Sequence, residues 1–217
     1  MKNIYFMPGM AANCLIFEHL KLDSEKYNLH YIEWIEPNKN EPLQDYCNRI
    51  AQKIKHPNPV LIGVSFGGIV VQEISKQINA EKVIIISSVK DFSEFPPHIL
   101  WARKWKLFRF FPTSLFNPAK KLLQKTIVSK KKKHRLAIYD KYLTFCSKNY
   151  LDWAFKNVIL WENKNPLKNV YHLHGRKDFI FPAKKIKNAF FIENGTHVMI
   201  LTHAKGISKK LIEIIEK

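Results

Sequence analysis

Residues 59–78 read PVLIGVSFGGIVVQEISKQI and carry the most informative structural pattern in the chain. Residues 59–64 are almost continuously apolar, which predicts a strand buried on both faces. Residues 69–78 carry apolar side chains at helical spacing, which predicts a helix. Gly63-Val64-Ser65-Phe66-Gly67 joins the two and has the G-x-S-x-G pattern of a sharp strand-to-helix turn. The residues two before and two after Ser65 must be small for such a turn to close, and glycine supplies both.

The same alternation of strand and helix continues on either side of this stretch. Short apolar or alternating runs predict strands, and segments with a helical apolar face predict helices between them. Continuous apolar strands separated by helices indicate an α/β fold, with a mostly parallel sheet of about six strands and helices on both faces. The further predicted strands are residues 3–7, 29–34, 82–87, 170–174 and 189–192, and the further helices are residues 15–22, 43–55 and 204–217.

The rhythm breaks after the fourth predicted strand. Residues 91–165 contain no convincing strand; they are aromatic, basic and mostly helical in character, and four prolines interrupt them. We therefore expect a core formed by residues 1–90 and 166–217, with a basic helical cap inserted at 91–165.

The net charge is the most unusual feature of the composition. The 217 residues hold 36 Lys and Arg against 18 Asp and Glu, a formal charge of +18. Residues 98–150 alone carry fourteen Lys and Arg and one acid. Such an excess favours an anionic partner, either an acidic protein or an anionic lipid surface, although a lysine run such as residues 130–133 also suits a solvated helix face. The stretch has no zinc-finger spacing or RNA-binding signature, which argues against a nucleic-acid partner.

The cysteines and the apolar runs argue against a zinc site and against a membrane-spanning segment. Cys14, Cys47 and Cys146 are few, widely spaced and without a CxxC pair, so we expect no zinc site and a reducing compartment, with the cytoplasm as the predicted location. The longest apolar run, residues 60–71, is too short to span a membrane. Peripheral contact with a membrane stays compatible with the basic, aromatic cap.

A serine at such a turn needs a base, and the base needs an orienting acid. Asp178 follows the predicted strand at 170–174, and His197 follows the strand at 189–192. The chain order Ser65, Asp178, His197 places all three groups at the carboxyl ends of parallel strands. Asp91 follows another strand and is the alternative acid.

Other histidines are open to more than one interpretation. His172 and His174 lie on or at the end of a predicted strand, so each is either a packed core histidine or an alternative base.

Four loops carry a resemblance to a known superfamily. They are PGMAAN at 8–13, GVSFGG at 63–68, HGRKD at 174–178 and NGTH at 194–197, and they hold six of the seven glycines. With the strands between them, they resemble a small, capped esterase or thioesterase of the α/β-hydrolase fold superfamily. The resemblance implies a three-layer core and an oxyanion hole formed by the backbone N–H groups of Met10 and Phe66. Many relatives have His-Gly where this chain has Pro8-Gly9, a change that a backbone donor tolerates.

The resemblance implies a serine hydrolase that cleaves a carboxylic ester or thioester through an acyl-enzyme, without a metal or an organic cofactor. The cap aromatics Trp101, Trp105 and Phe108 either line a pocket for an apolar acyl group or pack over the sheet. The charge of the cap suggests an anionic carrier or leaving group, such as acyl carrier protein or coenzyme A.

Two other functions remain open from the sequence. One is a non-catalytic binding protein whose basic cap docks on an anionic protein or lipid. The other is a cofactor-free haloperoxidase or lyase, because such enzymes share the turn and the triad.

Overall fold

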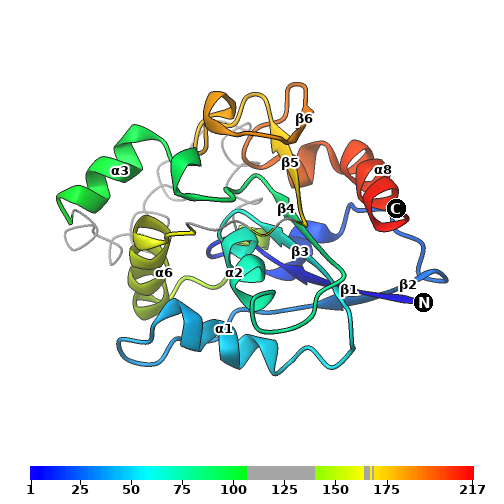
Figure 1. The fold of residues 1–217 in the computed structure, drawn as a ribbon, viewed down its shortest axis with the longest axis horizontal. Helices are drawn as coiled ribbons and strands as arrows, with labels where there is room; N and C mark the ends of the chain where they lie inside the picture. Colours follow the sequence, from blue (N-terminus) through cyan, green and yellow to red (C-terminus); the bar gives the residue numbers. More distant parts are fainter. Residues whose placement is uncertain (107–139, 164–166, 168) are drawn as a thin grey trace.

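The computed structural model describes residues 1–106, 140–163, 167 and 169–217. Six strands form one sheet in the order β2-β1-β3-β4-β5-β6, and every neighbouring pair is parallel (Figure 1). This confirms the predicted α/β class and the number of strands. The strands are β1 (Lys2–Met7), β2 (Tyr27–Tyr31), β3 (Val60–Val64), β4 (Lys82–Ile86), β5 (Val170–Gly175) and β6 (Phe190–Ile192).

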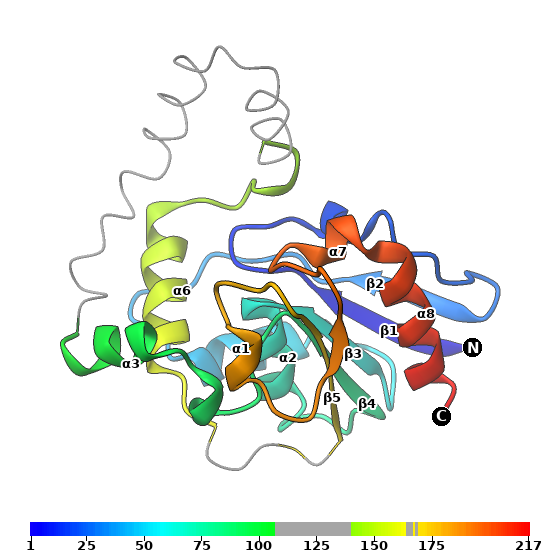
Figure 2. The same ribbon diagram turned by 90° about the horizontal axis from the view of Figure 1, so that it is seen from above.

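Helices cover both faces of the sheet, which gives three layers (Figure 2). One face carries α1 (Leu43–Ala51), α2 (Phe66–Ile74) and α6 (Lys148–Leu160), and the other carries the 3-10 helix η1 (Cys14–Phe17), α7 (Met199–Thr202) and α8 (Ala204–Ile215). Successive strand residues point to opposite faces, so Tyr5 and Met7 enter the first core and Ile4 and Phe6 the second. All ten residues of β3 and β4 are buried, as expected for central parallel strands.

The helix after Ser65 begins earlier than the pattern predicts, at Phe66 instead of residue 69, and ends at Ile74. Two glycines in its first turn hide the helical periodicity from the sequence. The helix predicted at 15–22 is reduced to the 3-10 turn η1.

The edge strand β2 also differs from its prediction, because it covers Tyr27–Tyr31 rather than residues 29–34. Its neighbour β1 continues into Pro8, which has no N–H to extend the ladder. The Ile32 N–H still bonds the Phe6 carbonyl, at 2.9 Å, and the chain then leaves the sheet.

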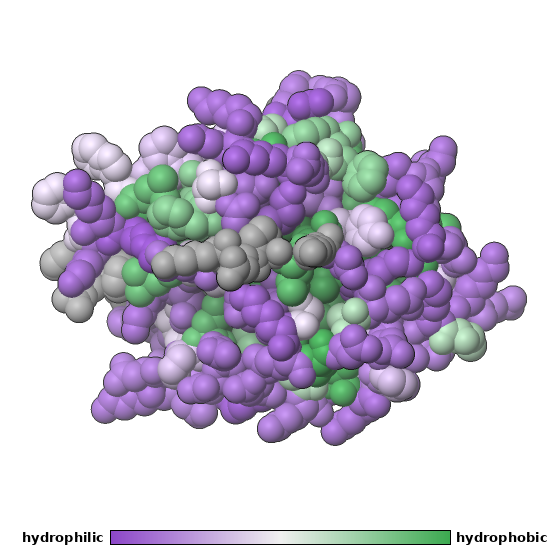
Figure 3. Space-filling view, in the orientation of Figure 1, coloured by the Kyte–Doolittle hydropathy of each residue, from purple (hydrophilic) through white to green (hydrophobic). Residues whose placement is uncertain are grey.

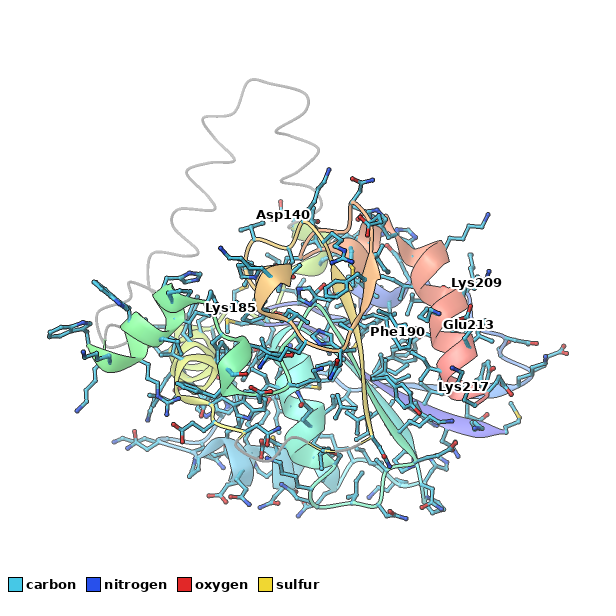
Figure 4. All side chains as sticks on the ribbon, turned by 45° about the horizontal axis from the view of Figure 1, so that its top comes forward. Asp140, Lys185, Phe190, Lys209, Glu213 and Lys217 are labelled. Atoms are coloured by element: carbon cyan, nitrogen blue, oxygen red, sulfur yellow. The ribbon has the colours of Figure 1, made fainter. Side chains whose placement is uncertain are left out.

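The last helix, α8, is amphipathic. Ile207, Leu211 and Ile214 pack on the sheet, and Figure 4 shows Lys209 and Glu213 on its polar side. Two lysines at the starts of strands provide donors for the last carbonyl of the helix: Lys2 and Lys82 both donate to the Ile215 carbonyl, at 2.7 and 3.0 Å. Cations at this end also complement the helix dipole.

Between β4 and β5 the described residues form the 3-10 helix η2 (Phe92–Glu94), then α3 (Pro97–Lys104) and α6. Phe108 and the lysine run at 130–133 lie outside the described residues, so the bounds of the cap stay a prediction. The face seen in Figure 3 is mainly hydrophilic, in keeping with the charged composition. Across the described ranges, every helix is too short or too polar to cross a membrane.

Candidate active site

Ser65 lies on a strained turn between β3 and α2. Its φ and ψ are 52° and −118°, a conformation that L-residues rarely adopt. The neighbouring glycines allow it by close approach: a Cβ on Gly63 would lie 2.3 Å from the Gly67 carbonyl oxygen, and a Cβ on Gly67 would lie 2.3 Å from the Pro8 carbonyl oxygen. The Ser65 N–H donates to the Ile86 carbonyl at 2.9 Å. The turn is therefore held between the ends of β1 and β4.

Ser65, His197 and Asp178 form one line of hydrogen bonds. His197 Nε2 is 2.9 Å from Ser65 Oγ, and His197 Nδ1 is 2.9 Å from Asp178 Oδ2. The Asp178 side chain is completely buried, and its other oxygen accepts the backbone N–H groups of Ile180 and Phe181 at 2.8 and 3.0 Å. Such an arrangement can take a proton from the serine hydroxyl and stabilise the imidazolium that forms.

The acid and histidine loops are fastened to each other. The Lys177 N–H donates to the Gly195 carbonyl at 2.8 Å. A Cβ on Gly175 would lie 2.3 Å from that same carbonyl oxygen, so only glycine allows the two loops to approach this closely. The Phe181 ring packs edge-on against the imidazole of His197, with 5.6 Å between centroids. These contacts fix the plane of the imidazole.

His172 and His174 form a fully buried histidine pair next to Asp178. His174 Nε2 is 2.8 Å from the Phe181 carbonyl and 3.6 Å from Asp178 Oδ2. Because a carbonyl only accepts, Nε2 carries the proton, and His174 Nδ1 then accepts from His172 Nε2 at 3.0 Å. Burial lowers the pKa of His174 and lowers that of His172 well below its usual value. Both rings are thus neutral members of the core, not bases for Ser65.

The predicted oxyanion donors lie beside Ser65. A Cβ on Gly9 would meet the Ser65 Cβ at 3.5 Å, so the loop that carries Met10 runs against the serine. Phe66 is the first residue of α2, where N–H groups have no partner inside the helix. Within the described ranges, the N–H groups of Met10 and Phe66 have no acceptor.

The remaining predicted residues lie elsewhere. Asp91 accepts the Ser93 N–H at 2.7 Å as the N-cap of η2, so Asp178 and not Asp91 is the hydrogen-bonded partner of His197. Trp101 on α3 and Trp105 at its end are 67% and 62% exposed. Neither belongs to the hydrogen-bonded line, and a role in lining a substrate pocket stays a prediction for both. Phe108, the third of these aromatics, lies outside the described residues.

Sequence reasoning missed the residues that support the site from other elements. Ser88, two residues after β4, donates from Oγ to the Ser65 carbonyl at 2.7 Å. Trp34 donates from its indole to the Gly9 carbonyl at 2.9 Å. Only the strand order, which places the ends of β2, β1, β3 and β4 side by side, could have indicated these contacts.

Solved structures share this fold over most of their length. The enol-lactonase from Burkholderia xenovorans LB400 matches with a TM-score of 0.73 at 12% identity, and the match covers 100% of this chain and 92% of that one. An esterase from Exiguobacterium antarcticum and a bromoperoxidase from Bacillus anthracis match with TM-scores of 0.65 and 0.64, each at 16% identity over 100% of this chain and 92% of theirs. No protein-family model and no curated protein sequence matches the chain significantly. The chain therefore has the α/β-hydrolase fold, and at this identity the likeness shows the fold alone.

Proposed function

We propose that this protein is a serine hydrolase that cleaves a carboxylic ester or thioester through an acyl-enzyme. The observation that carries the proposal is the line of two 2.9 Å hydrogen bonds from Asp178 through His197 to Ser65. Packing of an ordinary core does not require a strained serine, a part-exposed histidine and a buried carboxylate to be hydrogen-bonded in this order. General-base activation of a serine requires all three groups in this order.

The reaction follows from the roles that the geometry allows. His197 Nε2 takes the proton from Ser65 Oγ as the oxygen attacks the substrate carbonyl, and Asp178 stabilises the imidazolium. The N–H groups of Met10 and Phe66 bind the negative oxygen of the tetrahedral intermediate. His197 then gives its proton to the leaving alcohol or thiol, and the acyl group remains on Ser65. A water molecule, deprotonated by His197, then attacks the acyl-enzyme; the acid leaves, and His197 returns the proton to Ser65 Oγ.

We propose an apolar acyl group on an anionic carrier, such as acyl carrier protein or coenzyme A, as the substrate. Phe179 and Val198 directly follow Asp178 and His197 and are 73% and 51% exposed, so apolar surface lies beside the reacting groups. The net charge of +18 favours an anionic leaving portion. The preference for an anionic leaving group is tested by the ratio of two kcat/KM values, one for an acyl-coenzyme A and one for a neutral nitrophenyl ester of the same acyl chain. The ratio should fall several-fold with added salt, since exposed attraction is screened.

A fluorophosphonate probe tests the reaction itself. The wild type should be labelled, and labelling should vanish in Ser65→Ala and His197→Ala. Ser75→Ala serves as the matched control, because Ser75 caps the far end of α2 and should leave labelling unchanged. A folded wild type that neither labels nor hydrolyses any ester would contradict the proposal and favour a binding role.

A further inference from the structure

The orientation of the Gly9–Met10 peptide is fixed from its carbonyl side. The Gly9 oxygen accepts two hydrogen bonds, from Trp34 Nε1 at 2.9 Å and from the Ala12 N–H at 3.0 Å. The peptide is trans, and in a trans peptide the C=O and the following N–H point in opposite directions. Fixing the Gly9 carbonyl therefore fixes the direction of the Met10 N–H.

Trp34 contacts the second proposed oxyanion residue as well. Its ring stacks on the ring of Phe66, with 5.3 Å between centroids and 11° between planes. Trp34 is only 4% exposed and also packs against Tyr150, at 5.3 Å. One rigid side chain thus joins the loop after β1 to the first residue of α2.

We propose that Trp34 is a positioning residue that holds the two donors of the oxyanion hole in register. The inference rests on the proposed function and assigns a role to a residue outside the triad. Trp34 touches no reacting atom; it acts through the Gly9 carbonyl and through the Phe66 ring. A pre-oriented N–H stabilises a developing oxyanion without reorganisation, which is why the direction of the Met10 peptide matters for rate.

Two observations distinguish this role from simple core packing. The Ala12 N–H already satisfies the Gly9 oxygen, so the indole bond adds a second constraint on direction rather than rescuing a buried carbonyl. Other groups hold the neighbouring residue: the Ala11 N–H donates to the Tyr150 hydroxyl at 3.4 Å, and the Ala11 carbonyl accepts the Phe145 N–H at 3.1 Å. The loop is therefore clamped on both sides of the Met10 N–H.

The test compares two tryptophan-to-phenylalanine variants. Trp34→Phe keeps an aromatic ring that can stack on Phe66, but it lacks the indole N–H and has one six-membered ring in place of the fused indole. Trp153→Phe is the matched control, because Trp153 is also buried and also meets the Phe66 ring, edge-on at 5.7 Å between centroids. Its indole N–H donates to the Glu41 carbonyl at 2.8 Å and not to the Gly9 carbonyl, so the comparison isolates the bond to Gly9. Both variants should lower the urea midpoint of unfolding similarly.

Two readouts are measured on each protein: kcat and KM for p-nitrophenyl acetate, and the order parameter of the Met10 amide from nitrogen-15 relaxation. In Trp34→Phe we expect kcat to fall about tenfold with KM within about twofold, part of the 10²–10³-fold cost of deleting an oxyanion donor. The Met10 order parameter should fall from a rigid value of about 0.85 to below about 0.6. In Trp153→Phe both quantities should stay at the wild-type values.

Equal loss of kcat in the two variants, or an unchanged Met10 order parameter in Trp34→Phe, overturns the proposal. The relaxation measurement does not depend on hydrolysis. A wild type without esterase activity would therefore contradict the proposed function, while the Met10 amide would still show whether Trp34 orients that peptide.

Discussion

Gly67→Ala should damage stability and hydrolysis together, and the size of the effect follows from the structure. A Cβ at this position would lie 2.3 Å from the Pro8 carbonyl oxygen and 2.5 Å from that of Met7, whereas ordinary van der Waals contact begins at 3.4 Å. The start of α2 would have to move by about 1 Å against backbone atoms that cannot rotate away. Overpacking of this kind costs about 1–3 kcal/mol in the free energy of unfolding. A displacement of about 1 Å in the attacking group lowers the rate by about 10²-fold.

The assay is urea unfolding for stability and kcat/KM on p-nitrophenyl acetate for activity. Gly206→Ala is the control with the opposite sign: it lies inside α8, and its Cβ would meet nothing within 4 Å. It should stabilise the protein by about 0.5–1 kcal/mol, because alanine restricts the unfolded chain and favours helix, and it should leave kcat/KM unchanged. A Gly67→Ala variant that unfolds at the wild-type urea midpoint with wild-type kcat/KM would contradict this prediction.

Three further predictions follow from buried polar groups. Asp178→Asn should lower kcat by about 10⁴-fold, because an amide favours the wrong tautomer of His197; steady-state kinetics measures this. The free energy of unfolding should fall as pH drops from 7.5 to 5.5, since the unfolded chain takes up protons that buried, neutral His172 and His174 do not; each contributes up to about 1.4 kcal/mol per pH unit. Urea titrations should show a shallower fall in His172→Gln, whose amide can still donate to His174. Glu94→Ala should cost about 2–3 kcal/mol by urea unfolding, because two backbone N–H groups lose their acceptor.

Each of these has an outcome that contradicts it. Asp178→Asn with kcat within tenfold of the wild type would mean that the carboxylate does not assist His197. Identical pH slopes in wild type and His172→Gln would mean that His172 titrates normally when folded. For Glu94, the control is Glu193→Ala, whose exposed ion pair with Arg176 should contribute less than about 0.5 kcal/mol; an equal loss in both variants would remove the argument from burial.

The sequence predicted the parts of the fold that depend on local pattern. The central strands β3 and β4 could be predicted because they are buried on both faces, which makes their apolar runs continuous. The turn at Ser65 could be predicted because only glycine at positions 63 and 67 allows the backbone to approach so closely, and the sequence has glycine at both positions.

What the sequence could not predict depends on neighbours distant in the chain. The early end of β2 follows from Pro8, the residue directly after the adjacent strand β1. The contact of Trp34 with the Gly9 carbonyl follows from the strand order, since alternation alone marks Trp34 as one more strand residue. His172 and His174 were open to two interpretations, and only burial and their hydrogen bonds identify them as core.

The proposed machinery is divided between two stretches of chain that meet at one seam. Residues up to Ile86 supply the nucleophile and both oxyanion donors, and residues from Val170 onward supply the acid and the base. In the sheet the two stretches meet where β5 pairs with β4, from Val83↔Val170 to Ile86↔Leu173. A brief parting of that seam would leave Ser65 on its turn but take His197 away from it. Mild heat or denaturant is thus expected to abolish the proposed hydrolysis before it unfolds the protein.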